Sequence, residues 1–156
     1  MSNDTDKQIR LAIKAVGIAP SYPEAAVYPW NALSHDIAEW PGLFRTDDDT
    51  THGWIIKRSG TASNWRTFMQ KVNRSWAYDL FGFYGFRSGM QGDNSDDEWG
   101  EILDTVWANI KASYNLGLEG VVERHELLQF ASITTIDTGE ETLHFAHGRL
   151  TVELCC

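Results

Sequence analysis

The sequence predicts a single α+β domain, residues 1–156, in which an antiparallel or mixed sheet is flanked by an N-terminal helix and one long amphipathic helix. Two stretches repeat apolar residues at helical spacing, one near the N-terminus and one past the middle of the chain. Between and after them lie stretches rich in β-formers, and the last has the alternation and turn of a long β-hairpin. This order is typical of helices packed on an antiparallel sheet. With 156 residues, 42% of them hydrophobic, the chain has the size and apolar content of one domain.

The first expected helix covers residues 4–16. Its apolar residues recur at the spacing of one helix face, at Ile9, Ala12, Ile13 and Val16. Gly17 is suited to the position just after a helix. Residues 18–50 contain apolar side chains without a sustained period, so we treat them as an irregular segment or an insertion within the domain.

The following segment is expected to form strands. Residues 53–57 are a short β-prone run, whereas the small polar residues 59–64 predict a loop or a hairpin tip. Residues 65–86 are rich in β-formers and alternate with the period of a strand from 76 to 86, where both faces are mostly apolar near 81–86. Apolar side chains on both faces are typical of a central strand that is covered on both sides.

The clearest expected element is a helix over residues 95–114, which follows a loop at residues 88–94. Ser95 and Glu98 form a capping box, in which each side chain satisfies a backbone amide of the first turn. One apolar stripe at helical spacing follows, at Trp99, Ile102, Leu103, Val106, Trp107, Ile110 and Tyr114. Gly117 is the expected end of this helix.

The last third predicts a pair of strands. Residues 127–136 and 143–154 both alternate with period two, and residues 137–141 between them have the composition of a turn. The result is a terminal β-hairpin.

The net charge is −9, which argues against tight nucleic-acid binding, because that affinity comes from Lys and Arg at phosphates. The charge is unevenly placed. Residues 61–91 carry four basic side chains against one acidic, whereas residues 92–156 carry three basic against thirteen acidic. These segments suit attraction between copies of the chain, although solvated faces explain them as well.

The only cysteines are Cys155 and Cys156, so there is no disulfide framework, and a reducing cytosol is the expected place of synthesis. The N-terminus lacks the pattern of a signal peptide, and we expect no membrane-spanning segment.

The triplet Asp137-Thr138-Gly139 occurs in aspartic proteases, where two such aspartates share one proton. A lone copy requires a homodimer to complete the pair. Asp and Gly are also ordinary turn residues, and Glu140 and Glu141 add like charge beside the triplet. We therefore favour a turn.

Metal and cofactor sites are not expected. His144 and His147 are three residues apart and point to opposite faces of a strand, and the remaining histidines have no ligand spacing: His35, His52 and His125. Asp97, Glu101 and Asp104 line one side of a helix, which suits a divalent cation but is also the usual wet face of an acidic protein. We favour the wet face. No P-loop or nucleophile elbow occurs, so we expect no enzyme.

A run of basic and aromatic residues is the strongest candidate for a binding surface. It comprises Trp65, Arg66, Phe68, Lys71 and Arg74. Such residues suit a platform for single-stranded nucleic acid, but they are also the preferred anchors of protein interfaces, which we favour in an acidic protein. The acidic counterparts expected at a contact between subunits are Asp93, Asp96 and Asp97.

The arrangement of residues 53–154 resembles that of the tail terminator, or tail-completion, proteins of long-tailed bacteriophages. The likeness lies in a first strand at Gly53-Trp54-Ile55-Ile56, a long aromatic strand at residues 76–87, the helix at 95–114 and the terminal hairpin at 128–154. It is a likeness of pattern and order and includes no signature motif.

The resemblance implies a structural virion protein that is made in the host cytoplasm and has neither catalytic residues nor a cofactor. Members form a ring, usually a hexamer, at the head-proximal end of the tail tube. The ring stops tube polymerisation and meets the head–tail connector, and DNA passes through its lumen without specific binding. Partners would therefore be further copies of the chain, the tail tube protein and a connector or adaptor protein.

Three other hypotheses remain open from the sequence. One is another neck component, such as a head–tail adaptor, although adaptors are more helical. A second is a small α+β ligand-binding module with a pocket near residues 76–86. The third is a dimeric aspartic protease that uses Asp137.

Overall fold

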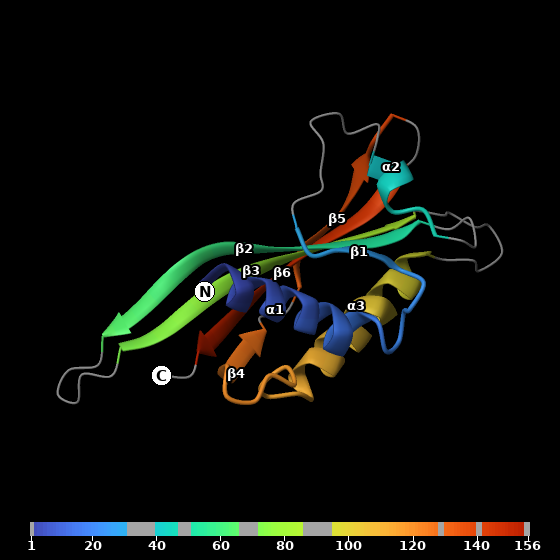
Figure 1. The fold of residues 1–156 in the computed structure, drawn as a ribbon. Coiled ribbons are helices and arrows are strands. Elements are labelled where there is room, and N and C mark those ends of the chain that lie inside the picture. Colours follow the sequence, from blue (N-terminus) through green and yellow to red (C-terminus); the bar gives the residue numbers. More distant parts are fainter. Residues whose placement is uncertain are drawn as a thin grey trace.

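The computed structural model describes residues 2–30, 40–46, 51–65, 72–85, 95–127, 130–139 and 142–154. These residues form a mixed α+β fold around a six-stranded sheet (Figure 1). The strands are β1 (Ala26–Tyr28), β2 (His52–Trp65), β3 (Val72–Gly85), β4 (Val122–Leu127), β5 (Ala131–Asp137) and β6 (Thr142–Leu154). The expected α+β class with a mixed sheet is therefore confirmed.

The sheet has the order β1-β2-β3-β6-β4, and β5 also pairs with β6. Only β1 and β2 run parallel; the other pairs are antiparallel. Both β4 and β5 pair with β6, β4 with its C-terminal half and β5 with its N-terminal half. β6 is consequently a central strand, and β1 and β4 lie at opposite edges.

Helices cover both faces of the sheet unequally. α1 (Ser2–Ile13), the π-helix η1 (Lys14–Ile18) and α3 (Ser95–Lys111) lie on one face, and the single turn α2 (Trp40–Leu43) lies over part of the other (Figure 1). The larger core fills the space between the sheet and the first three helices. Its fully buried side chains include Ile9, Ile13, Trp54, Tyr78, Leu80, Trp99, Val106 and Ile110.

The π-helix packs closely on α3. Gly17 lies against α3, where an added Cβ would stand 2.6 Å from Cγ1 of Ile110. The Gly17 carbonyl oxygen, in the last turn of the helix, accepts a hydrogen bond from Nδ2 of Asn109 at 3.1 Å. The end of the first helix thus docks closely on α3.

A smaller core lies under α2. Phe44 is fully buried and stacks on Phe83, with ring centroids 4.6 Å apart and planes 11° apart. Ile55 and Leu143 complete the buried set. Gly53 makes room for Phe44, because a Cβ there would stand 1.9 Å from its ring. Part of the segment 18–50 is therefore ordered on the sheet, as β1 and α2.

The expected loop at residues 59–64 is wrong. These residues belong to β2, which pairs with β3 from His52↔Tyr84 to Trp65↔Val72. Their composition is poor in β-formers, with Thr61 the only one, but pairing with β3 outweighs this weak local preference, and a bulge lies between Arg58 and Gly60.

The prediction of one continuous strand at residues 127–136 is also wrong. Leu127 ends β4 and Ala131 begins β5, so the two strands meet β6 one after the other. β4 escaped prediction because its sequence, Val-Glu-Arg-His-Glu-Leu, has three exposed charged residues and little apolar alternation. α3 ends at Lys111, before the expected stop, and Gly117 has positive φ in the turns that follow.

Candidate functional site

Two residues of the basic half of the expected interface, Trp65 and Arg74, lie at the end of the β2–β3 pair. β3 pairs with β6 only as far as Ser75, whereas β2 and β3 continue beyond it through residues 63–65 and 72–74. We call these six residues the ribbon; it projects past the sheet at the left of Figure 1. Trp65 and Arg74 belong to it by their backbone positions. Three other expected residues lie outside the described residues: Arg66, Phe68 and Lys71.

The acidic half maps to the opposite end of the fold. Asp96 and Asp97 are exposed in the first turn of α3, while Asp93 lies outside the described residues. α3 begins at the right of Figure 1, far from the ribbon. Within one chain, the described members Trp65 and Arg74 are therefore not brought together with Asp96 and Asp97, and a contact between them requires two copies arranged head to tail.

The N-terminus of α3 contains a buried polar cluster that sequence reasoning did not find. Ser95 Oγ lies 2.8 Å from Nε2 of His144, and Nδ1 of the same ring lies 3.5 Å from Oδ1 of Asp96. Burial lowers the pKa of His144, against the opposing effect of Asp96. The alternation of β6 indicated that His144 faces away from His147, but not that it reaches Ser95.

This Ser–His–Asp arrangement does not have the exposure of a catalytic triad. Ser95 is fully buried, whereas the Asp96 side chain is 69% exposed. A working triad has the reverse order, with an accessible nucleophile and a shielded carboxylate. Ser95 stands at the start of α3, so we assign the cluster to holding the end of the helix on β6.

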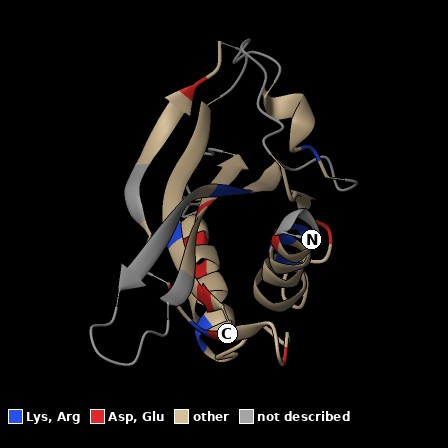
Figure 2. Cartoon of the chain, turned by 60° about the vertical axis from the view of Figure 1, so that its left-hand side comes forward, with Lys and Arg blue, Asp and Glu red and all other residues tan. Residues whose placement is uncertain are grey.

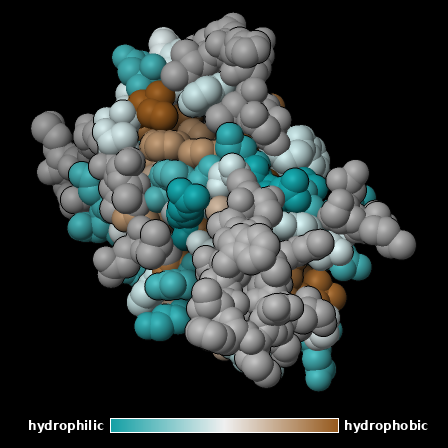
Figure 3. All heavy atoms as spheres, turned by 90° about the vertical axis from the view of Figure 1, so that its left-hand side faces the viewer, coloured by the Kyte–Doolittle hydropathy of each residue, from teal (hydrophilic) through white to brown (hydrophobic). Residues whose placement is uncertain are grey.

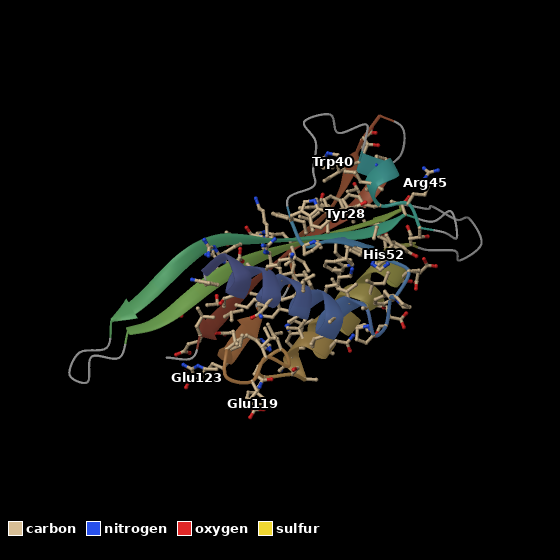
Figure 4. All side chains as sticks on the ribbon, viewed as in Figure 1. Tyr28, Trp40, Arg45, His52, Glu119 and Glu123 are labelled. Atoms are coloured by element: carbon tan, nitrogen blue, oxygen red, sulfur yellow. The ribbon has the colours of Figure 1, made fainter. Side chains whose placement is uncertain are left out.

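A second buried histidine is enclosed by aromatic rings. His52 is 4% exposed and accepts a hydrogen bond at Nε2 from Nε1 of Trp54 at 2.9 Å. The rings of Tyr22, Tyr84 and Trp99 meet it edge-on. Burial lowers the pKa of His52 to about 4, so the ring is neutral at pH 7. In Figure 4, His52 lies between the sheet and the start of α3.

The face of the sheet opposite α1 and α3 carries a partly exposed cluster. Asp79 Oδ1 lies 2.7 Å from Nε2 of His147, whose side chain is 33% exposed. Phe81 stacks on His147 with centroids 4.8 Å apart, and Lys57 Nζ lies 5.4 Å from the centroid of Phe81. The dyad has a base and its orienting carboxylate, but no nucleophile among the residues named here, and it matches a structural ion pair better than an active site.

Among the described residues, no three His, Cys, Asp or Glu side chains are grouped to hold a metal ion. Asp97, Glu101 and Asp104 line an open recess along α3 with Gly100, on the helix side where acidic residues gather in Figure 2. The Asp137 side chain accepts a hydrogen bond from the amide of Gly139 at 2.9 Å, which is the bond of a tight turn.

The pocket expected by the ligand-binding hypothesis does not fit the packing around residues 76–86. Tyr78 and Leu80 are fully buried, and a Cβ on Gly82 would stand 2.7 Å from the Trp99 ring. A recess of about 420 Å³ lies nearby, but its lining is polar and charged: Ser75, Arg124, His125, Glu126, Thr151 and Glu153. Small-molecule sites are mostly apolar.

Figure 3 faces the end where the ribbon projects and, among the residues that it colours, shows both hydrophilic and hydrophobic side chains. In the described part of the chain, no helix has the length and apolar character needed to cross a membrane.

No protein-family model matches the chain, and no curated protein matches it significantly in sequence.

Proposed function

We propose that this chain is a structural virion subunit of the tail terminator type. Copies assemble into a ring, of six in the resembled family, that caps the head-proximal end of a phage tail tube. The ring stops tube polymerisation and joins the tail to the head–tail connector. It is made in the host cytoplasm, ends in the virion, and requires neither a cofactor nor catalytic residues.

The ribbon is the observation that carries this proposal. Its three residue pairs, from Ser63↔Arg74 to Trp65↔Val72, extend beyond the edge that β6 supports. An isolated two-stranded ribbon is marginally stable in water and has unpaired backbone groups on both sides. A projecting ribbon is therefore best explained by a partner that receives it.

The positions of charge support head-to-tail contacts. The basic segment includes the ribbon, and the acidic first turn of α3 lies at the other end of the molecule (Figure 1). Rings require such heterologous contacts, in which two different surfaces of each subunit meet. The coarse architecture, a mixed α+β fold with a six-stranded mixed sheet, is compatible with the resemblance.

The acidic character of the chain fits passage of DNA through a ring. With a net charge of −9, the subunit offers few cations to hold phosphates. The exposed acidic side of α3, at Asp97, Glu101 and Asp104, would repel the DNA backbone where it faced the lumen. DNA would then slide past and not adhere.

The test is a tube-elongation assay with tail tube protein from the same source. Added chain is expected to shorten the tubes and to leave a ring at one end, as seen by electron microscopy. The double variant Arg66→Glu/Arg74→Glu should lose this effect, while Arg149→Glu, a single charge reversal of the same kind at an exposed position on β6, should retain it. Unchanged tube length with the native chain would refute the proposal.

A head–tail adaptor is the second candidate, because it needs the same kind of ring contact but binds the portal end. The six-stranded sheet favours the terminator over this more helical class. Rings that bind connectors and ignore tubes would identify an adaptor.

A further inference from the structure

The sheet has two edges that the described residues leave without a partner strand. β1 pairs with β2 only at Gly53, Trp54 and Ile55, so the outer edge of β2 is unpaired from Ile56 onward. At the other side of the sheet, β4 pairs with β6 alone among the described strands, and the Leu127 carbonyl oxygen accepts a hydrogen bond from Nε1 of Trp107 at 3.3 Å. Unpaired edges offer rows of backbone donors and acceptors to another chain.

The directions of the strands make the two edges compatible. β2 runs antiparallel to β3, and β3 antiparallel to β6, so β2 and β6 run the same way. β4 runs antiparallel to β6 and therefore to β2. If a second copy continues the sheet without being turned over, its β4 meets β2 of the first copy as an antiparallel neighbour.

The two faces of the sheet also continue correctly. Lys57 pairs with Asp79, which pairs with Arg149, so all three share one face. Glu126 pairs with Thr151, two residues after Arg149, and lies on that same face. An antiparallel pair that places Lys57 opposite Glu126 of the next copy therefore sets opposite charges side by side, which stabilises a pair of strands.

The same register brings apolar residues together on the helix side. With Lys57 opposite Glu126, Ile56 stands opposite Leu127, and both belong to the larger core or pack against it. Bulges follow on each strand, between Arg58 and Gly60 and between Val122 and Arg124. The pairing is accordingly short and ends where both strands bend.

Besides Lys57 and Glu126, other charged residues near the outer edge of β2 and near β4 also have opposite signs. Near β4, three glutamates are exposed: Glu119, Glu123 and Glu126. Figure 4 shows Glu119 and Glu123 pointing outward beside β4. Arg124 is already paired with Glu153 of the same chain, which leaves the β4 edge acidic. β2 presents Lys57 and exposed Arg58, whose guanidinium lies 4.8 Å from the centroid of Trp76.

We propose that copies of this chain join head to tail by antiparallel pairing of the outer edge of β2 at residues 56–58 with β4 of the next copy at residues 125–127. This inference deepens the proposed ring and rests on it for the closure of the chain of copies. Because the contact is heterologous, each subunit uses one edge for each neighbour, and the sheet continues around the ring. The pairing sets neighbouring copies side by side with their ribbons extending the same way along the strands, so the ribbon is a separate contact surface from this one.

Charged residues and bulges also protect edge strands from unwanted pairing. The two explanations differ in what they predict, since protection leaves both edges solvated whereas pairing holds Lys57 and Glu126 within reach of each other across two chains. A cysteine cross-link measures this directly, because a disulfide requires the two Cα atoms to lie within roughly 7 Å.

The experiment uses the full chain with Cys155 and Cys156 replaced by Ser and with Lys57→Cys and Glu126→Cys introduced together. The chain is mildly oxidised under two conditions, alone at high concentration and in the presence of tail tubes. We expect a ladder of covalent oligomers on a denaturing gel. A mixture of the two single variants should stop at the dimer, because each chain then has one reactive end. The matched control keeps Lys57→Cys but has Thr135→Cys in place of Glu126→Cys. Thr135 is exposed on β5, and this control should give at least tenfold less cross-linked product.

Three outcomes overturn the inference. They are cross-linking no stronger than in the Thr135→Cys control, dimers of Lys57→Cys alone in place of mixed dimers, and no cross-linking under either condition. The proposed function is judged separately by tube elongation. If tubes are capped without the cross-link, only the edge pairing falls; if the ladder forms but tubes grow unchecked, the pairing stands and the terminator function falls.

Discussion

The enclosure of His52 predicts a specific loss of stability in acid. Trp54 donates to Nε2 of the ring, so that nitrogen must be unprotonated in the native state. The pKa falls from the ordinary value of 6.5 to about 4 because burial penalises the charged ring. In the unfolded chain His52 regains its ordinary pKa, and between these two values the unfolded state binds more protons than the native state.

The sign and magnitude follow from this difference. The stabilisation is fully present above about pH 6.5 and is lost progressively as the pH falls toward about 4. Each unit of pKa shift corresponds to 1.36 kcal/mol, so lowering the pH from about 7.5 to about 5 should remove about 2 kcal/mol through this one residue.

Urea unfolding followed by tryptophan fluorescence measures the effect. Other groups titrate in the same range, so the native chain is compared with His52→Gln, whose amide oxygen can still accept from Trp54 but does not titrate. The native chain should lose about 2 kcal/mol more than the variant between the two pH values. Equal losses in both proteins would show that His52 is protonated without penalty and that the enclosure is not as described.

Three further predictions concern packing and turns. Phe44→Ala should reduce the free energy of unfolding by about 3–5 kcal/mol, because the ring is fully buried against Phe83, and a loss below ~1 kcal/mol in urea unfolding would contradict the smaller core. Gly82→Ala should cost about 1–3 kcal/mol through contact with two tryptophan rings, whereas Gly100→Ala, with open space around it on α3, should stabilise by up to about 1 kcal/mol; the opposite order would refute the packing. Asp137→Ala should cost about 1 kcal/mol through loss of its turn hydrogen bond, and a native chain that digests casein at acid pH in an Asp137-dependent way would restore the protease hypothesis.

Strong local signals in the sequence correspond to well-defined parts of the structure. Ser95, where the capping-box pattern places a helix start, is the first residue of α3, and Trp99, Val106 and Ile110 of the apolar stripe are buried against the sheet. The alternation of apolar residues from Leu143 onward predicts β6 correctly. One face of that strand packs under the helices and must therefore be apolar. Periodic burial is visible in a sequence because it constrains every second or every third to fourth residue.

Features that depend on pairing between distant segments were not predictable. Residues 59–64 are strand only because β3 lies beside them, and the charges of β4 hide its alternation. The hydrogen bond between Ser95 and His144 joins residues 49 positions apart, and the sequence pattern around either residue does not predict it. For the candidate interface, the sequence indicated charge of opposite sign in two segments but not that they occupy opposite ends of the molecule.

The central claim is that this chain functions as a ring built by head-to-tail contacts. Mass photometry of the purified native chain, with and without tail tubes of the same source, tests it most directly. The account predicts one discrete species of several subunits, in solution or released from tube ends, that is weakened by Arg66→Glu/Arg74→Glu. A chain that remains monomeric at every concentration and leaves tube ends bare would contradict it.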